Sequence, residues 1–222
     1  ENAVGIAAFL GAFAVSVGVL FIANIGGRAN AMKLLLGGMA LSAVCSAFSS
    51  FIVYFANDKE GIQTITYWMM GSLAGAKWEH MAIIGGIVAL AILFFWSQSR
   101  ILNLMLLGDA SAITLGTDLH PYRQGYLIVS SLVVGFAVFA AGMIGFVGLV
   151  VPHVVRMLVG TDHKRLIPVT ALVGAIFLVI SDGLCRVLIP HTELPIGILI
   201  ALVGAPAFIY LMVKRTYGFG GQ

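Results

Sequence analysis

Few side chains in this sequence have the type and spacing to do chemistry together. Asp182 and Arg186 stand four residues apart, a spacing that places them on one face of a helix, where they can form an ion pair. His153 lies between Pro152 and Arg156 in an apolar run. A histidine in that position could carry a proton or bind a ligand, but a hydrogen-bonded packing role is more common.

No group of residues suggests an enzyme. Cys45 and Cys185 each lie inside an apolar run, and they make no metal-ligand spacing with each other or with the five histidines. The sequence shows no glycine-rich nucleotide loop, no H-E-x-x-H zinc motif and no G-x-S-x-G nucleophile motif. We therefore expect no catalytic activity, no metal and no cofactor in this chain.

The composition predicts the elements that position these residues. Of the 222 residues, 60% are hydrophobic and only 9% are charged. A water-soluble domain of this size needs a more highly charged surface. Because the apolar residues occur in uninterrupted runs rather than in alternation, the predicted fold class is all-α, a polytopic helical membrane protein.

Seven apolar runs are candidates for membrane spans, which need about 20 residues each. The predicted spans are residues 3–23, 34–56, 81–97, 125–143, 145–159, 167–189 and 195–213. The fifth is short, and we expect it to be irregular. The chain begins at Glu1 with no initiating methionine or signal peptide, so we expect a fragment of a longer protein.

The distribution of basic residues predicts the orientation. One set of alternate connections holds eight of them: Arg28, Lys33, Arg100, Arg123, Lys164, Arg165, Lys214 and Arg215. The other set holds only Lys59 and Lys77. By the positive-inside rule the first set is cytoplasmic, which predicts a cytoplasmic C-terminus and a cytoplasmic loop at residues 100–124.

A stripe of small residues runs along the second predicted span. Gly38, Ser42, Ser46 and Ser50 recur at intervals of four and so share one helical face. Such a face can pack closely against another helix, or its hydroxyl groups can line a pore. The sequence leaves both interpretations open.

The loop between the third and fourth predicted spans has its own pattern. Gly108 and Gly116 divide residues 103–119 into two short amphipathic helical stretches, and Asp109 can cap the second. An amphipathic loop of this kind could lie on lipid headgroups. Its mixed charge, in place of a basic face, favours contact with a protein partner.

Glycine, proline and glutamate residues in two further segments predict local backbone structure. Glycines and a proline in residues 141–156 predict close backbone approach and a kinked helix. They are Gly142, Gly145, Gly148 and Pro152.

Glu193 and Pro195 fit the first turn of the last span, where a carboxylate suits the helix dipole and proline is tolerated.

Five segments occur in an order that is specific to one family. They are Y-W-M-M-G-S-L-A-G at 67–75, L-G-D-A-S-A-I-T-L-G at 107–116, G-F-V-G-L-V-V-P-H-V-V-R at 145–156, G-T-D-H-K-R-L-I-P at 160–168 and E-L-P-I-G-I-L-I-A-L-V-G-A-P-A-F at 193–208. With these segments the chain resembles the permeases of type II ABC importers, which take up iron-siderophores, haem and cobalamin. Chance similarity between apolar helices would not reproduce the polar residues in order.

The resemblance implies an architecture and a set of partners. The family's subunit has ten spans, and residues 1–222 look like its fourth to tenth. The functional unit is a homodimer in the bacterial cytoplasmic (inner) membrane, with two ATP-hydrolysing subunits below it. A soluble binding protein delivers the solute from outside, and no nucleic acid takes part.

The resemblance also assigns roles to residues. The loop at 100–124 carries a coupling element that sits in a cleft of the ATPase, made of Leu107, Gly108, Asp109, Ala110, Ser111, Leu115 and Gly116. Asn30, Ala31 and Met32 resemble the part that narrows the pathway at its inner end. Arg186 matches a basic position that pairs with acidic residues of the binding protein, a role that competes with pairing to Asp182.

The predicted function is therefore import of a bulky metal chelate by alternating access, driven by ATP hydrolysis on partner subunits. Iron-siderophore is the commonest cargo of the family that the chain resembles. The alternative is a secondary transporter or channel, which would need ionisable residues at mid-membrane. Only Asp182 and Arg186 come near that position, and they can pair.

Overall fold

The computed structural model describes residues 2–25, 27–56, 58–189 and 194–214, and the regular secondary structure of these residues is helical. The helices are α1 (Asn2–Asn24), α2 (Ala31–Phe55), α3 (Lys59–Met70), α4 (Trp78–Ser97), α5 (Ser99–Leu106), α6 (Asp109–Thr114), α7 (His120–Ala141), α8 (Val147–Val159), α9 (His163–Leu188) and α10 (Ile196–Lys214). The predicted all-α fold class is confirmed.

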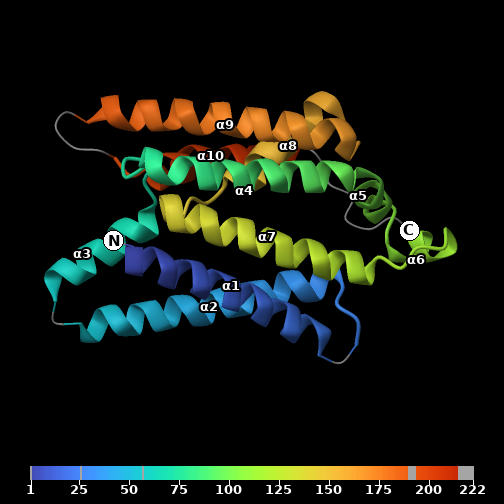
Figure 1. Cartoon of the computed structure of the whole chain (residues 1–222), viewed down its shortest axis with the longest axis horizontal. Coiled ribbons are helices and arrows are strands. Elements are labelled where there is room, and N and C mark those ends of the chain that lie inside the picture. The colour runs from blue at the N-terminus through green and yellow to red at the C-terminus, as the bar shows by residue number, and fades with distance from the viewer. Residues whose placement is uncertain (1, 26, 57, 190–193, 215–222) are drawn as a thin grey trace.

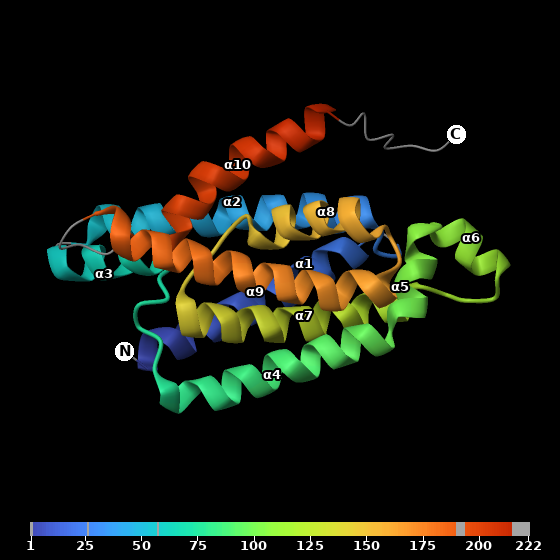
Figure 2. The ribbon, with the colours of Figure 1, turned by 90° about the horizontal axis from the view of Figure 1, so that it is seen from above.

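The long helices lie side by side and alternate in direction (Figure 1). α1 packs against α7 and α2, while α9 packs against α8 and α4. The short helices mark the two ends of the bundle, with α3 at one end and α5 and α6 at the other (Figures 1 and 2). α10 contacts α8 and α9 and then diverges from the other helices (Figure 2).

Five of the described helices are long and apolar enough to cross a membrane, namely α1, α2, α4, α7 and α9, with 20 to 26 residues each. At about 1.5 Å per residue, even 20 residues reach the roughly 30 Å of a bilayer core. α8 has 13 residues and reaches only about 20 Å. The apolar part of α10, Ile196–Leu211, is also shorter than a full span. A multi-pass membrane protein is supported, while the count of seven spans stays a prediction.

Little of the apolar surface is buried inside the chain. One small core contains Val151, Val155 and Leu166, and a second contains Cys185, Ile196 and Ile200. Large side chains on the long helices are exposed, such as Phe21 at 72% and Val179 at 72%. This distribution suits a bilayer, because lipid tails solvate apolar side chains and leave little reason to bury them in protein.

The turn after α3 and the connection from α7 to α8 are held together by their backbones. The Met143 amide donates to the Trp68 carbonyl at 3.2 Å. Gly71 and Gly142, with φ of 68° and 67°, both adopt the left-handed region that favours glycine. A Cβ on Gly71 would lie 2.5 Å from the Met143 carbonyl oxygen, and one on Gly142 would lie 2.6 Å from that of Trp68. Only glycine fits at either position.

This junction bears out part of the expectation for residues 141–156. The predicted irregularity is confirmed, since residues 142–146 are not helical and α8 starts only at Val147. Close backbone approach occurs at Gly142. It does not occur at Gly145 or Gly148, where an added Cβ would have no heavy atom of the described chain within 4 Å. Pro152 lies inside α8.

Candidate functional site

The loop that carries α5 and α6 projects from one end of the bundle (Figures 1 and 2). Large apolar side chains on it are exposed: Leu106 by 49%, Leu107 by 59%, Ile113 by 59% and Leu115 by 65%. These residues lie outside the five long apolar helices, so hydrocarbon does not account for them. An exposed apolar patch in such a place is typical of a surface that contacts a protein partner or lipid headgroups.

The division of this loop by glycines is confirmed, but the predicted cap is wrong. Gly108 and Gly116 have φ of 85° and 82° and interrupt the chain on either side of α6. The N-cap of α6 is Gly108, and no side chain caps the helix. Asp109 stands at the first helical position instead. Its carboxylate turns away from the α6 amides and binds an arginine of another helix.

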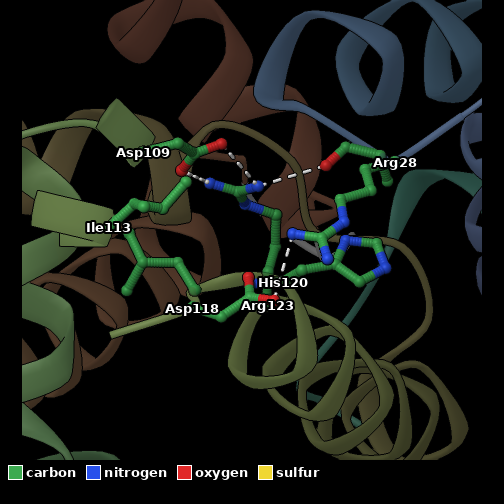
Figure 3. Close-up of a pocket in the computed structure, with 8 residues that line it drawn as sticks. Arg28, Asp109, Ile113, Asp118, His120 and Arg123 are labelled. Atoms are coloured by element: carbon green, nitrogen blue, oxygen red, sulfur yellow. Dashed lines mark hydrogen bonds and ion pairs between the residues drawn. The ribbon is translucent and has the colours of Figure 1, made fainter. Parts of the chain in front are cut away.

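That arginine is Arg123, in the first turn of α7. Its Nη2 donates to Asp109 Oδ1 at 2.6 Å and its Nη1 to Oδ2 at 3.3 Å, while Nη1 also donates to the carbonyl of Ala29 at 3.1 Å (Figure 3). The Arg123 side chain is only 17% exposed. The hydrogen bond from Arg123 holds the pKa of Asp109 below its ordinary value, so the carboxylate is charged at neutral pH.

A second ion pair lies beside the first. Arg28 Nη1 approaches Asp118 Oδ2 at 3.1 Å, with side chains 70% and 47% exposed. A cavity of about 90 Å³ lies between the two pairs and is also lined by Ile113 and His120 (Figure 3). The connection from α1 to α2 is thus joined to the α5–α6 loop at two points, one through the largely buried Arg123 and one through the exposed Arg28.

The same connection contains the residues expected at the inner end of the pathway. Asn30 caps α2 by accepting the Lys33 amide at 2.8 Å. Ala31 and Met32 form the first turn of α2 and are exposed, while Ala29 is buried at 3%. The structure therefore brings the predicted gate residues next to the predicted coupling residues. Sequence reasoning missed this link, because it used Arg123 and Arg28 only to predict orientation.

The other end of the loop is anchored to the start of α9. Asn103 of α5 donates to Asp162 at 2.8 Å and accepts the backbone amide of His163 at 2.9 Å. Its oxygen also lies 2.7 Å from His163 Nδ1, which must donate because the amide oxygen can only accept. Trp96 donates to the Lys164 carbonyl at 3.0 Å. This network, which the sequence did not reveal, holds α5 and the end of α4 against the start of α9.

The stripe of hydroxyl residues faces outward from this chain. Ser42, Ser46 and Ser50 on α2 are exposed, and a Cβ on Gly38 would have no heavy atom of the described residues within 4 Å. Ser50 hydroxyl donates to the Ser46 carbonyl within the helix at 2.9 Å. No described helix of this chain packs closely on the stripe, so its role as pathway lining stays a prediction.

At the opposite end of the bundle, the predicted charge pair is present. Arg186 Nε donates to Asp182 Oδ2 at 2.8 Å, and the side chains are 47% and 24% exposed. Both lie in the last two turns of α9. Glu193 lies outside the described residues. Pro195 is buried directly before α10, in agreement with its predicted place at the start of the last helix.

His153 and Arg156 occupy structural positions in α8. His153 Nδ1 lies 2.7 Å from the Leu149 carbonyl, and its ring meets Phe208 edge-on with centroids 5.6 Å apart. These contacts favour the packing role over a ligand or proton carrier. Arg156 is in the last turn of α8, where a positive charge suits the helix dipole. In the described ranges no three His, Cys, Asp or Glu side chains gather as a metal site would require.

Comparison with known proteins places the chain in a family of membrane permeases. The FecCD transport family matches residues 1–214. The chain is 36% identical over 210 residues to the hemin transport system permease protein HmuU of Yersinia pestis, covering 95% of this chain and 62% of the relative. It is 41% identical over 209 residues to the cobalamin import system permease protein BtuC of Halobacterium salinarum, covering 94% and 56%.

A third relative and a solved structure are also similar to this chain over most of its length. The vitamin B12 import system permease protein BtuC of Salmonella typhi is 38% identical over 216 residues, covering 96% of this chain and 64% of the relative. A solved structure described as "an inward-facing conformation of a putative metal-chelate type ABC transporter" matches with a TM-score of 0.80 and 36% identity, covering 90% of this chain and 63% of that one.

The chain therefore spans between 56% and 64% of the length of these proteins. The match nevertheless extends over nearly every described residue and includes all five motifs recognised in the sequence. The resemblance to the permease subunits of type II ABC importers is confirmed, and the chain belongs to the FecCD transport family.

Proposed function

We propose that this chain forms the larger part of a permease subunit that imports a bulky metal chelate by alternating access, powered by ATP hydrolysis on partner subunits. The observation that carries the proposal is the family match over residues 1–214. The structure adds a helical bundle with an exposed two-helix loop at one end. The seven predicted spans would then be the fourth to tenth of a ten-span subunit.

The proposed cargo is a metal held in a large organic ligand. The relatives are named for hemin, cobalamin and vitamin B12, and the solved structure is described as a metal-chelate type transporter. Iron-siderophore shares this chemistry and is the cargo that we propose for this protein. Ser42, Ser46 and Ser50 would contribute a weakly polar lining to its pathway.

The proposed partners occupy the two ends of the bundle. Two ATPase subunits would receive the α5–α6 loops of a permease homodimer, with the exposed Leu107 and Leu115 entering the contact. A soluble binding protein would dock at the other end, near Arg186. Asn30, Ala31 and Met32 would narrow the pathway at the ATPase side.

Uptake by the complete transporter tests the function. In liposomes that contain the intact permease, its ATPase subunits and its binding protein, we expect a ferric siderophore to stimulate ATP hydrolysis and to accumulate. Accumulation should require ATP on the ATPase side and should not respond to an ion gradient. Haem and cobalamin are the competing cargoes. Failure of all three to stimulate hydrolysis would refute the chelate proposal, and gradient-driven uptake without ATP would establish the secondary transporter.

We also propose that the α5–α6 end is cytoplasmic, as is the C-terminus. The eight-to-two split of basic residues supports this orientation, and α3 and α6 lie at opposite ends of the bundle (Figure 1). Glu60→Cys on α3 and Ser111→Cys on α6 replace exposed residues. In sealed cells that lack other accessible cysteines, a membrane-impermeant maleimide should label position 60 and spare position 111 until the cells are opened. The reverse labelling pattern would invert the proposed orientation.

A further inference from the structure

The coupling helix α6 has few attachments to the rest of the described chain. It packs against α5 and projects from the end of the bundle (Figures 1 and 2). Its first residue, Asp109, is held by Arg123, and Arg123 is held in place by the first turn of α7. α6 is therefore connected to the bundle through α5, through residues 115–119 that lead into α7, and through the side-chain contact between Asp109 and Arg123.

Arg123 joins two segments that are far apart in the chain. Its guanidinium donates two hydrogen bonds to the Asp109 carboxylate and a third to the Ala29 carbonyl, 94 residues away (Figure 3). Ala29 is buried at 3% and directly precedes Asn30, the N-cap of α2. A displacement of Asp109 thus acts, through one side chain, on the residue that precedes the N-cap of α2.

The chemistry of this junction suits a mechanical link. A bidentate arginine–carboxylate pair is directional and stronger than a neutral hydrogen bond. The Arg123 side chain is 17% exposed and the Asp109 side chain 49%, so water reaches the pair mainly from the carboxylate side. The neighbouring Arg28–Asp118 pair joins the α1–α2 connection to the connection between α6 and α7, and its side chains are 70% and 47% exposed. Exposed pairs of that kind contribute little. Of the two pairs, the one that contains Arg123 has the more buried arginine and an additional hydrogen bond to the Ala29 carbonyl.

We infer that Arg123 clamps α6 to the connection between α1 and α2, so that an ATPase that displaces α6 also moves the start of α2. The ATPase contact rests on the proposed function, whereas the clamp rests on the geometry of Arg123. Lysine could not replace it, because a single ammonium group lacks the planar fork that reaches the carboxylate and the carbonyl together.

Hydrogen–deuterium exchange can follow both segments in the intact transporter. Peptides covering residues 27–33 and 107–117 report the connection and α6, and exchange is measured with and without ATP. In the unaltered transporter both peptides should change on ATP addition. In Arg123→Met only the α6 peptide should change, and uptake per ATP hydrolysed should fall about tenfold, as expected from loss of charge-assisted hydrogen bonds.

Two variants distinguish loss of the clamp from general destabilisation of the protein. Arg28→Gln removes the exposed pair and should behave as the unaltered protein in both peptides. Asp109→Asn keeps the size of the side chain and leaves Arg123 in place, yet it should reproduce the uncoupling in part. It is the fallback if Arg123→Met does not fold.

Three results would overturn the clamp. The first is a normal ATP response of residues 27–33 in Arg123→Met. The second is no response of those residues in the unaltered transporter while α6 responds. The third is an equal effect of Arg28→Gln and Arg123→Met. If the ATPase does not protect α6 at all, the proposed function fails instead. The clamp is then tested in the permease without its ATPase subunits. There, Arg123→Met should speed hydrogen exchange in residues 27–33, and unchanged exchange would refute the clamp.

Discussion

Gly71→Ala is expected to lower the stability of the permease by roughly 2 kcal/mol or more. Gly71 has φ of 68° and ψ of 139°, a sparsely populated conformation that costs a residue with a Cβ about 1–3 kcal/mol. The new methyl group would also lie 2.5 Å from the Met143 carbonyl oxygen, closer than real Cβ atoms approach backbone. The turn after α3 would have to separate from the connection between α7 and α8.

A nearby glycine provides the matched control. Gly75 lies four residues further on and has no positive φ, and a methyl group added to it would have no heavy atom of the described residues within 4 Å. Gly75→Ala should therefore leave the melting temperature in detergent nearly unchanged, while Gly71→Ala lowers it by several degrees. Equal melting temperatures for the two variants would show that the junction between residues 71 and 143 does not support the fold.

Arg186→Ala is expected to weaken docking of the binding protein about tenfold at low ionic strength and to leave the permease folded. The pair of Asp182 and Arg186 is partly exposed, at 24% and 47%. An ion pair with that much access to water contributes little to stability, under about 1 kcal/mol. A guanidinium at the end of α9 can also reach outward to an acidic residue of a partner.

The competing hypothesis makes a different prediction from the same residue. If Arg186 chiefly neutralises Asp182, its removal leaves a poorly solvated carboxylate, and the protein becomes unstable. The double variant Arg186→Ala with Asp182→Asn would then recover folding, as a double-mutant cycle can show. Melting temperature and binding-protein affinity, each measured at two salt concentrations, distinguish the two roles. Normal affinity in a well-folded Arg186→Ala permease would refute the docking role.

Features that depend on residues close together in the sequence could be predicted from the sequence alone. Apolar runs about 20 residues long predicted the five long helices, because the bilayer imposes that length on any helix that crosses it. Gly108 and Gly116 predicted the breaks around α6, since only glycine readily adopts positive φ. The pair of Asp182 and Arg186 followed from helical periodicity. Asp109 shows the limit of local reasoning, because a partner on another helix took the place of the expected cap.

The contacts that give the molecule its candidate mechanism were decided by tertiary structure. Arg123 meets Ala29 across 94 residues, and Asn103 meets His163 across 60. No local period relates such positions, and a basic residue near a span end looks the same in sequence whether it faces headgroups or a carboxylate. Likewise, Gly71 and Gly142 are ordinary turn glycines until packing brings the two backbones together. Helix packing selects these partners, because it decides which polar groups from distant parts of the chain come within hydrogen-bonding distance.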